Sequence, residues 1–251
     1  MAPHPILLFA PEGAEQIGDV GKACLWIAFV GLFLPAVYMF KAAFNQPDGK
    51  RYFHILSALI CAIASLAYLC MASGYGDLFV FGHDGVYRQF FFIRYVDWVF
   101  TTPLMLLDLA GLAGASSDTT FMMLSLDALM ILSGLAGALI GGSDSASWAC
   151  WAFGMLCFLP VVKFLLVDLP GNASGSASAI FKKVSMLTVV MWSLYPLVWI
   201  LAEGTSVISS DIETVLYTIL DVTAKSVFGL LIVGARDGLD DALARPLVPR
   251  T

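Results

Sequence analysis

Residues 53–74 read FHILSALICAIASLAYLCMASG, with no acidic residue and, apart from His54, no basic one. About 20 apolar residues in an α-helix span the roughly 30 Å of hydrocarbon in a bilayer. This stretch is therefore predicted to be a helix that crosses a membrane.

The composition of the chain extends this interpretation to the whole molecule. Hydrophobic residues make up 59% of the 251 residues and charged residues 13%, and the mean hydropathy is +0.86. A soluble domain of this size needs more charge to cover its surface. Seven long apolar stretches are separated by turn residues, and each is long enough to cross a bilayer. The predicted spans cover about 20–41, 53–74, 89–113, 119–141, 147–169, 178–201 and 212–235.

The predicted fold class is an all-α membrane protein, a bundle of seven transmembrane helices. Pro103 and Pro196 lie inside spans, which membrane helices tolerate when neighbouring groups bond the freed carbonyls. Residues 1–246 are expected to form one domain, and residues 247–251 are interpreted as the remnant of an added protease site. The five cysteines lie in apolar runs without ligand-like spacing, so we expect packing residues and no metal site.

Basic residues near the span ends set the predicted orientation. They gather in the loops after the first span and before the sixth, and in the C-terminal tail: Lys41, Lys50, Arg51, Lys182, Lys183, Arg236 and Arg245. The opposite end carries Lys22 and Arg88. The N-terminus is therefore expected outside the cell and the C-terminus in the cytoplasm, in a multi-pass plasma-membrane protein surrounded by lipid. No basic cluster is large enough to hold a nucleic acid.

The seventh span carries two charged residues in apolar surroundings, Asp221 and Lys225. A charged side chain at the centre of a spanning helix costs roughly 2.5–3.5 kcal/mol. The two residues are four apart and therefore share a helix face. One interpretation is an ion pair that only neutralises itself. The other is that a buried lysine loses its proton readily and attacks a carbonyl to form a Schiff base.

The third span carries a second set of polar residues on one face: Arg94, Asp97, Thr101 and Asp108. At 1.5 Å per residue, Asp97 and Asp108 lie about 16 Å apart along the helix axis. Cationic neighbours should keep Asp97 ionised, whereas the leucines around Asp108 should keep that carboxyl protonated at neutral pH. The span therefore predicts one proton acceptor and one proton donor on a common stripe.

Three motifs together resemble the microbial rhodopsins, specifically the light-driven proton pumps related to bacteriorhodopsin. Residues 94–108 follow the pump pattern of the third helix without a gap. Residues 221–225 are similar to the segment that attaches retinal, and residues 192–199 to the aromatic wall of the retinal pocket. The resemblance covers essentially all seven spans. Their sequences are closer to the fungal and algal pumps of the family than to the haloarchaeal ones.

The resemblance implies a role for each residue that matches a motif. Lys225 would carry all-trans retinal as a protonated Schiff base, with Asp97 and Asp221 as counterions and with Arg94 and Tyr68 in the same hydrogen-bonded group. The remaining pocket residues would be Trp98, Thr102, Met130, Gly134, Trp151, Trp192, Tyr195 and Trp199. Thr102 and Asp127 are similar to the hydrogen-bonded pair that joins the third and fourth helices in the family.

Some positions depart from the family pattern. Gly154 stands where many pumps have a hydroxyl residue, which puts the absorption colour in doubt. Glu213 keeps its register as a proton-release carboxylate, but the loop before it is one residue short, so Glu203 is the weaker counterpart. Near the cytoplasmic mouth, Asp48 aligns with a family carboxylate only after a shift, and His54 is interpreted as a tolerated interfacial histidine.

The predicted function is a light-driven outward proton pump, which makes the protein a transporter of protons and not an enzyme. Asp97 would accept the Schiff-base proton, Asp108 would replace it, and Arg94, Glu213 and Glu203 would pass a proton outward. The main alternative is a sensory photoreceptor that signals to a partner, although sensors generally lack a carboxylate at the position of Asp108. A light-gated ion channel is disfavoured because residues 54–74 offer no carboxylate to line a pore. Assembly into a homo-oligomer is left open.

Overall fold

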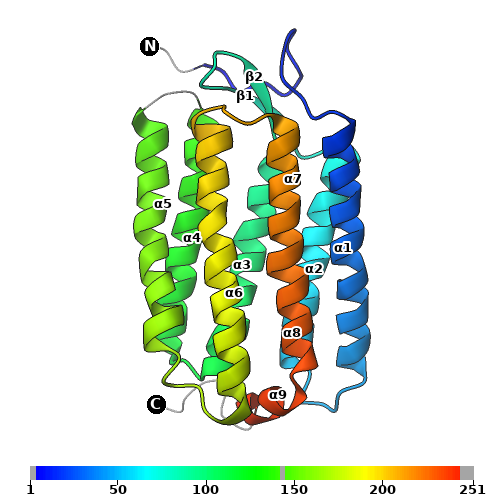
Figure 1. Cartoon of the computed structure of the whole chain (residues 1–251), viewed down its shortest axis with the longest axis vertical. Coiled ribbons are helices and arrows are strands. Elements are labelled where there is room, and N and C mark those ends of the chain that lie inside the picture. The colour runs from blue at the N-terminus through cyan, green and yellow to red at the C-terminus, as the bar shows by residue number, and fades with distance from the viewer. Residues whose placement is uncertain (1–3, 142–144, 244–251) are drawn as a thin grey trace.

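Seven long helices stand side by side in the computed structural model, which describes residues 4–141 and 145–243 (Figure 1). Each is long and apolar enough to cross a membrane. The spans are Asp19–Phe44, Tyr52–Ala72, Phe92–Ala113, Ser117–Ile140, Ser145–Asp168, Gly175–Gly204 and Ser210–Gly234. The first four are the helices α1, α2, α3 and α4.

The other three spans are made of more than one helical segment. The fifth is α5 (Ser145–Lys163) followed by the π-helix η1 (Phe164–Asp168), and the sixth is α6 (Gly175–Trp199) followed by η2 (Ile200–Gly204). The seventh joins α7 (Ser210–Asp221), η3 (Val222–Val227) and α8 (Phe228–Gly234). Single π-helical turns inside longer helices often mark functional sites, and η3 contains Lys225.

A β-hairpin at the end of the bundle that holds the N-terminus corrects the prediction for the third span (Figure 1). The strands β1 (Leu78–Phe81) and β2 (Tyr87–Phe90) pair antiparallel, with Leu78 opposite Phe90. The third span was expected to begin at about residue 89, but its helix begins at Phe92. The N-terminal segment also joins this layer, because Leu7 bridges to Phe79 and Glu15 bridges to Arg88.

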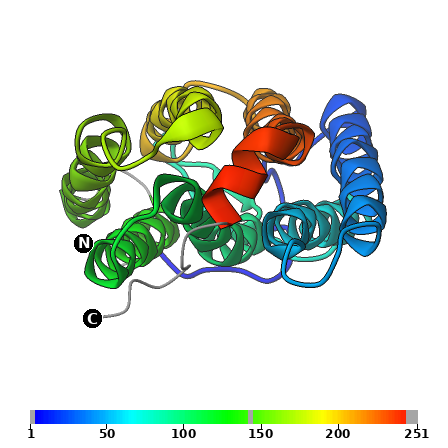
Figure 2. The same ribbon diagram turned by 90° about the horizontal axis from the view of Figure 1, so that it is seen from below.

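A short helix, α9 (Arg236–Leu243), lies across the opposite end of the bundle (Figures 1 and 2). The backbone N–H of Ser176, in the first turn of α6, donates to Asp241 Oδ2 at 2.7 Å. Lys50 Nζ pairs with Asp240 Oδ1 at 2.6 Å. These contacts tie α9 to the loop after α1 and to the start of α6, whereas this part of the chain was expected to be a tail.

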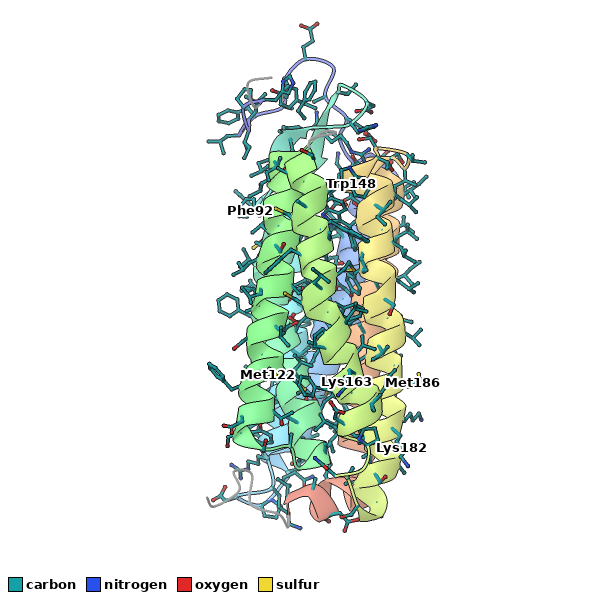
Figure 3. The ribbon with its side chains drawn as sticks, turned by 90° about the vertical axis from the view of Figure 1, so that its left-hand side faces the viewer. Phe92, Met122, Trp148, Lys163, Lys182 and Met186 are labelled. Atoms are coloured by element: carbon teal, nitrogen blue, oxygen red, sulfur yellow. The ribbon has the colours of Figure 1, made fainter. Side chains whose placement is uncertain are left out.

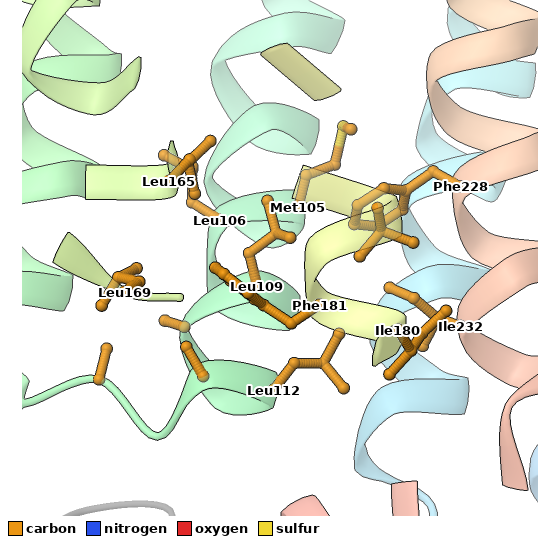
Figure 4. Packing of buried hydrophobic residues seen from close by; sticks show 14 of the residues in the cluster. Met105, Leu106, Leu109, Leu112, Leu165, Leu169, Ile180, Phe181, Phe228 and Ile232 are labelled. Atoms are coloured by element: carbon orange, nitrogen blue, oxygen red, sulfur yellow. The ribbon is translucent and has the colours of Figure 1, made fainter. Parts of the chain in front are cut away.

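The core of the bundle is apolar at this end, where Met105, Leu106 and Leu109 of α3 pack against Phe181 of α6 and Phe228 of α8 (Figure 4). Large apolar side chains also cover the outside of the helices, as expected for surfaces that face lipid. Phe92, Met122 and Met186 are 37%, 52% and 52% exposed, respectively, while Lys163 and Lys182 lie towards the end that carries α9 (Figure 3).

Some sequence predictions fall outside the described residues. They concern the turn residues Gly142, Ser143 and Asp144, the basic residue Arg245, the side chain of Arg236 and the residues 247–251. All five cysteines are described and free.

Candidate functional site

Lys225 lies at the centre of the bundle between two carboxylates. Its Nζ atom donates a hydrogen bond to Asp97 Oδ2 on α3. The same atom is 3.0 Å from Asp221 Oδ1, one helical turn earlier in its own span. The side chain of Lys225 is 2% exposed, and those of Asp97 and Asp221 are 1% and 0% exposed. Because unpaired charges are costly inside a bilayer, the three groups stabilise one another.

The two carboxylates differ in their other partners. Asp221 accepts hydrogen bonds from Tyr68 at 2.7 Å, from Trp98 at 3.1 Å and from Tyr195 at 2.8 Å. Asp97 Oδ1 is buried and has no hydrogen-bond partner among the described residues. Thr101, which was expected on the same face of the third span as Asp97, donates its hydroxyl to the Asp97 main-chain oxygen at 2.9 Å. Asp97 therefore has a free acceptor atom that Asp221 lacks.

A largely apolar cavity extends from Lys225 between α3, α4, α5 and α6. It contains about 750 Å³ of space free of protein atoms, part of it open to the outside. The residues that line it are Trp98, Thr102, Met105, Met130, Ile131, Gly134, Trp151, Gly154, Met155, Phe158, Trp192, Tyr195, Pro196, Trp199, Tyr217, Ala224 and Lys225.

The residues that the resemblance implies for the pocket wall all line this cavity. Tyr68, which the resemblance implies as a member of the counterion group, donates a hydrogen bond to Asp221. Sequence reasoning missed several lining residues, among them Met105, Met155, Phe158 and Tyr217. A signal was available in α5, where Trp151, Met155 and Phe158 recur at spacings of four and three and so share a face. An apolar, aromatic cavity with a buried lysine in its lining fits an elongated apolar aldehyde such as retinal.

Thr102 and Asp127 meet at the wall of this cavity. The Thr102 hydroxyl is within 2.8 Å of both Asp127 Oδ2 and the Trp98 carbonyl oxygen. Asp127 is fully buried, and its Oδ1 atom has no partner among the described residues. The contact joins α3 to α4 next to Trp98, so it fixes the side of the cavity nearest to the lysine.

Asp108 lies on α3, nearer to the end that carries α9. It is fully buried and its Oδ2 accepts a hydrogen bond from Ser57 of α2 at 3.0 Å. No basic residue pairs with it within residues 4–141 and 145–243. Ser57 was not predicted as a partner of Asp108, because a serine in a membrane-spanning helix costs little free energy and so does not stand out. One turn earlier, His54 is 5% exposed and its Nδ1 atom has no partner among the described residues.

Asp48, in contrast, lies on the surface. Its side chain is 93% exposed and pairs with Arg51 at 3.1 Å. The structure therefore does not bring Asp48 to the buried carboxyl of Asp108.

A second polar group lies beyond Asp97, towards the β-hairpin. Arg94 was expected beside Asp97, but its Nη1 atom donates to Glu213 Oε1 at 3.2 Å, and the guanidinium stacks on Tyr217 at 4.4 Å from the ring centroid. Glu203 Oε1 accepts from the Tyr217 hydroxyl at 3.5 Å. Glu203 and Glu213 line one small cavity under the hairpin together with Arg88, so Glu203 lies with Glu213 despite the shorter loop.

Comparisons with known proteins show the family of the chain. Residues 20–239 match the family model described as "Bacteriorhodopsin-like protein". Opsin-1 of Neurospora crassa is 34% identical over 245 residues, which cover 90% of this chain and 80% of that protein.

Two solved structures share the fold. One is described as a light-driven proton pump of Coccomyxa subellipsoidea, with 32% identity, a TM-score of 0.85 and coverage of 88% of this chain and 99% of that one. The other is halorhodopsin, described as a light-driven chloride pump, with 26% identity, a TM-score of 0.83 and coverage of 91% and 99%. The chain belongs to the bacteriorhodopsin-like proteins, a family of seven-helix, retinal-based, light-driven membrane transporters.

Proposed function

We propose that the protein is a light-driven pump that moves protons out of the cell. The observation that carries the proposal is the arrangement around Lys225. One counterion, Asp97, has an acceptor atom that no described residue occupies. A second carboxyl, that of Asp108, lies further along the same helix, where it is buried and has no cationic partner among the described residues. A carboxylate next to the lysine and a protonated carboxyl behind it are the two groups that a one-way proton relay requires.

Lys225 is the attachment site in this proposal, because it is the one lysine among the described residues that line the apolar cavity. Bound there as a Schiff base, retinal supplies light absorption and an isomerisation that lowers the proton affinity of the Lys225 nitrogen. Trp98 and Trp192 help to line the cavity and restrict the shape of its occupant.

The protein's own residues then transfer the proton. Asp97 accepts it from the Lys225 nitrogen, because no described residue donates a hydrogen bond to Asp97 Oδ1, whereas three donors hold Asp221. Asp108 supplies the replacement proton from the other side, about 16 Å away along α3. Arg94 and its partner Glu213 belong to the outer polar group, which passes a proton on to the outside.

The direction of transport rests on the proposed orientation. Lys41 lies in the last turn of α1, and Lys50 and Arg51 follow this helix near the end that carries α9. By the positive-inside rule, these residues favour a cytoplasmic location for this end. Asp108 is then the cytoplasmic carboxyl and Asp97 the extracellular one. In this orientation, proton transfer in the order given carries charge outward across the plasma membrane.

A chloride pump is the rival that the shared fold raises. The carboxylate of Asp97 bonded to Lys225 argues against it, because a fixed negative charge there repels an anion. A sensory photoreceptor remains the second candidate, since it needs the same pigment, but it has no need for the buried donor Asp108.

Light-induced acidification of the medium around expressing cells tests the proposal. The wild type is expected to acidify the medium when retinal is supplied. Asp108→Asn is expected to slow the return of the proton to the pigment by about 100-fold, because a positioned acid contributes about that factor. Asp118→Asn, which changes an exposed carboxyl in the first turn of α4, serves as the matched control and should pump normally. Normal turnover in Asp108→Asn would remove the donor role, and absence of acidification in the wild type would favour the sensor.

A further inference from the structure

Arg88 is a buried arginine in β2, close to the outer end of the bundle. Its Nη1 atom is 3.4 Å from Glu15 Oε2, and its Nη2 atom is 3.6 Å from Glu213 Oε2. Nη2 also donates to the main-chain oxygen of Ile208 at 2.8 Å. The guanidinium is therefore fixed by the N-terminal segment, by the loop before α7 and by α7 itself.

Glu213 consequently has two cationic neighbours. Arg94 reaches Oε1 at 3.2 Å and Arg88 reaches Oε2 at 3.6 Å, while the Glu213 side chain is 6% exposed. A buried carboxylate between two guanidinium groups is stabilised in its charged form. The second arginine thus favours an ionised Glu213.

Glu203 lines the same cavity as Arg88, but Arg88 pairs with Glu15 and Glu213 and not with Glu203. No basic group of the described residues is within 4.0 Å of it, its Oε2 atom is enclosed and has no partner, and the Tyr217 hydroxyl is 3.5 Å from Oε1. A carboxylate without a compensating charge is costly when its oxygen is shielded from water. Glu203 is therefore favoured in its neutral, proton-bearing form.

The charges around Lys225 agree with this assignment. The enclosed cations and carboxylates that pair with one another balance: Lys225, Arg94 and Arg88 against Asp97, Asp221 and Glu213. Glu15 is not part of this balance, because its side chain is 28% exposed and it accepts from the backbone N–H of Ser210 at the start of α7. An ionised Glu203 would leave one negative charge in excess.

We propose that Arg88 is a positioning residue that keeps Glu213 charged, so that Glu203 is the group that holds and releases the outward proton. The assignment rests on the proposed outward pumping. Because Glu213 stays charged between the two arginines, Glu203 is the carboxyl of this cavity that gives up a proton after Asp97 becomes protonated. The O–H bond of Glu203 breaks, its electron pair stays on the carboxylate, and the proton leaves to external water through the cavity that Glu203 shares with Arg88.

Light-minus-dark infrared spectra of the retinal-loaded protein test which glutamate loses the proton. The wild type is expected to show loss of a protonated-carboxyl stretch at the time of proton release. That signal should vanish in Glu203→Gln and persist in Glu213→Gln. Its disappearance in Glu213→Gln, with persistence in Glu203→Gln, would overturn the proposal.

Arg88 variants test the positioning role separately. Arg88→Gln is expected to add a second protonated-carboxyl signal, removed by Glu213→Gln, whereas Arg88→Lys should keep the wild-type pattern because it restores the charge. Lys22→Gln, which removes an exposed positive charge near the start of α1, is the matched control and should change nothing. An Arg88→Gln spectrum like that of the wild type, in protein with a normal visible band, would show that Arg88 is only structural.

Outward pumping is measured on the same variants in vesicles. A wild type that does not pump would refute the proposed function, whatever its infrared spectrum shows. A wild type that pumps but loses its proton from Glu213 would refute only the role of Arg88.

Discussion

Asp97 and Asp221 contact the same lysine nitrogen, but they differ in the number of hydrogen bonds that their carboxylates accept. Three donors from α2, α3 and α6 hold Asp221, so the free energy of accepting a proton there includes the loss of those hydrogen bonds. Asp97 keeps one carboxylate oxygen, Oδ1, that accepts no hydrogen bond from the part of the chain that the structure describes. The geometry therefore favours Asp97 as the acceptor and Asp221 as a fixed counter-charge.

Removing the acceptor charge should change both colour and transport. Asp97→Asn is expected to shift the visible absorption band to longer wavelength, because a weaker counter-charge no longer holds the positive charge at the Lys225 nitrogen in the ground state. Light-driven acidification should fall to the background. Absorption spectra and acidification of the same cells provide the measurement, with Asp19→Asn at the exposed first turn of α1 as the control. Undiminished acidification in Asp97→Asn would assign the acceptor to another group.

Residues whose presence is costly in a membrane could be singled out from the sequence. Asp97, Asp108 and Lys225 belong to this class, since each is a charge in an apolar run. Ser57 and Arg88 could not be identified in this way. A serine is inexpensive inside a helix, and an arginine between two spans has the pattern of a surface residue. Their partners, Asp108 and Glu213, are 51 and 125 positions away in the sequence (108 − 57 and 213 − 88), so only the fold reveals the pairs.

The helices show what periodicity and composition can predict. The centres of the spans follow from apolar length alone, but the start of α3 was misplaced because Tyr87–Phe90 pair with β1. The sequence did carry a signal, since two short apolar runs flank a turn with Gly82 and Gly85, a pattern typical of a hairpin. The short helix α9 gave no such signal, because its position depends on contacts such as that between Asp241 and Ser176.

The contact between α1 and α7 provides a stability test for one element. Asp211 Oδ1 accepts from the backbone N–H groups of Gly18 and Gly21 at 2.9 and 2.8 Å, and a Cβ atom on Gly21 would lie 2.5 Å from that oxygen and 2.8 Å from Ile17 Cβ. Gly21→Ala is therefore expected to lower the free energy of unfolding by about 1–3 kcal/mol, the usual cost of overpacking.

The control for this prediction lies in the same helix. A Cβ atom on Gly31 would meet Val222 at 3.5 Å, an ordinary contact, so Gly31→Ala should leave stability unchanged or raise it slightly. Thermal bleaching of the visible band of the purified, retinal-loaded protein measures both variants. Equal melting temperatures for the two would show that the α1–α7 contact adapts to the extra methyl group.

At the scale of the whole molecule, the two ends of the bundle differ in polarity. The end that carries α9 is closed by apolar side chains, among them Leu106, Leu109 and Phe181 (Figure 4). The end that carries the hairpin contains the ion pairs of Arg88 and Arg94 with Glu213. An apolar barrier on one side and a chain of ionisable groups on the other favour release towards the hairpin and slow, donor-limited uptake through Asp108.

This polarity has a direction in the cell only if the hairpin faces outside, and that orientation can be tested at two exposed turns. His83 lies in the turn between β1 and β2, and Asp48 lies in the loop between α1 and α2, with a side chain that is 93% exposed. In intact cells, a membrane-impermeant maleimide is expected to label His83→Cys and to leave Asp48→Cys unlabelled. After the cells are opened, both should react, and the wild type with its five native cysteines gives the background. Since a pump inserted the other way round would acidify the cell interior, preferential labelling of Asp48→Cys in intact cells would reverse the predicted direction of transport without changing the chemistry at Lys225.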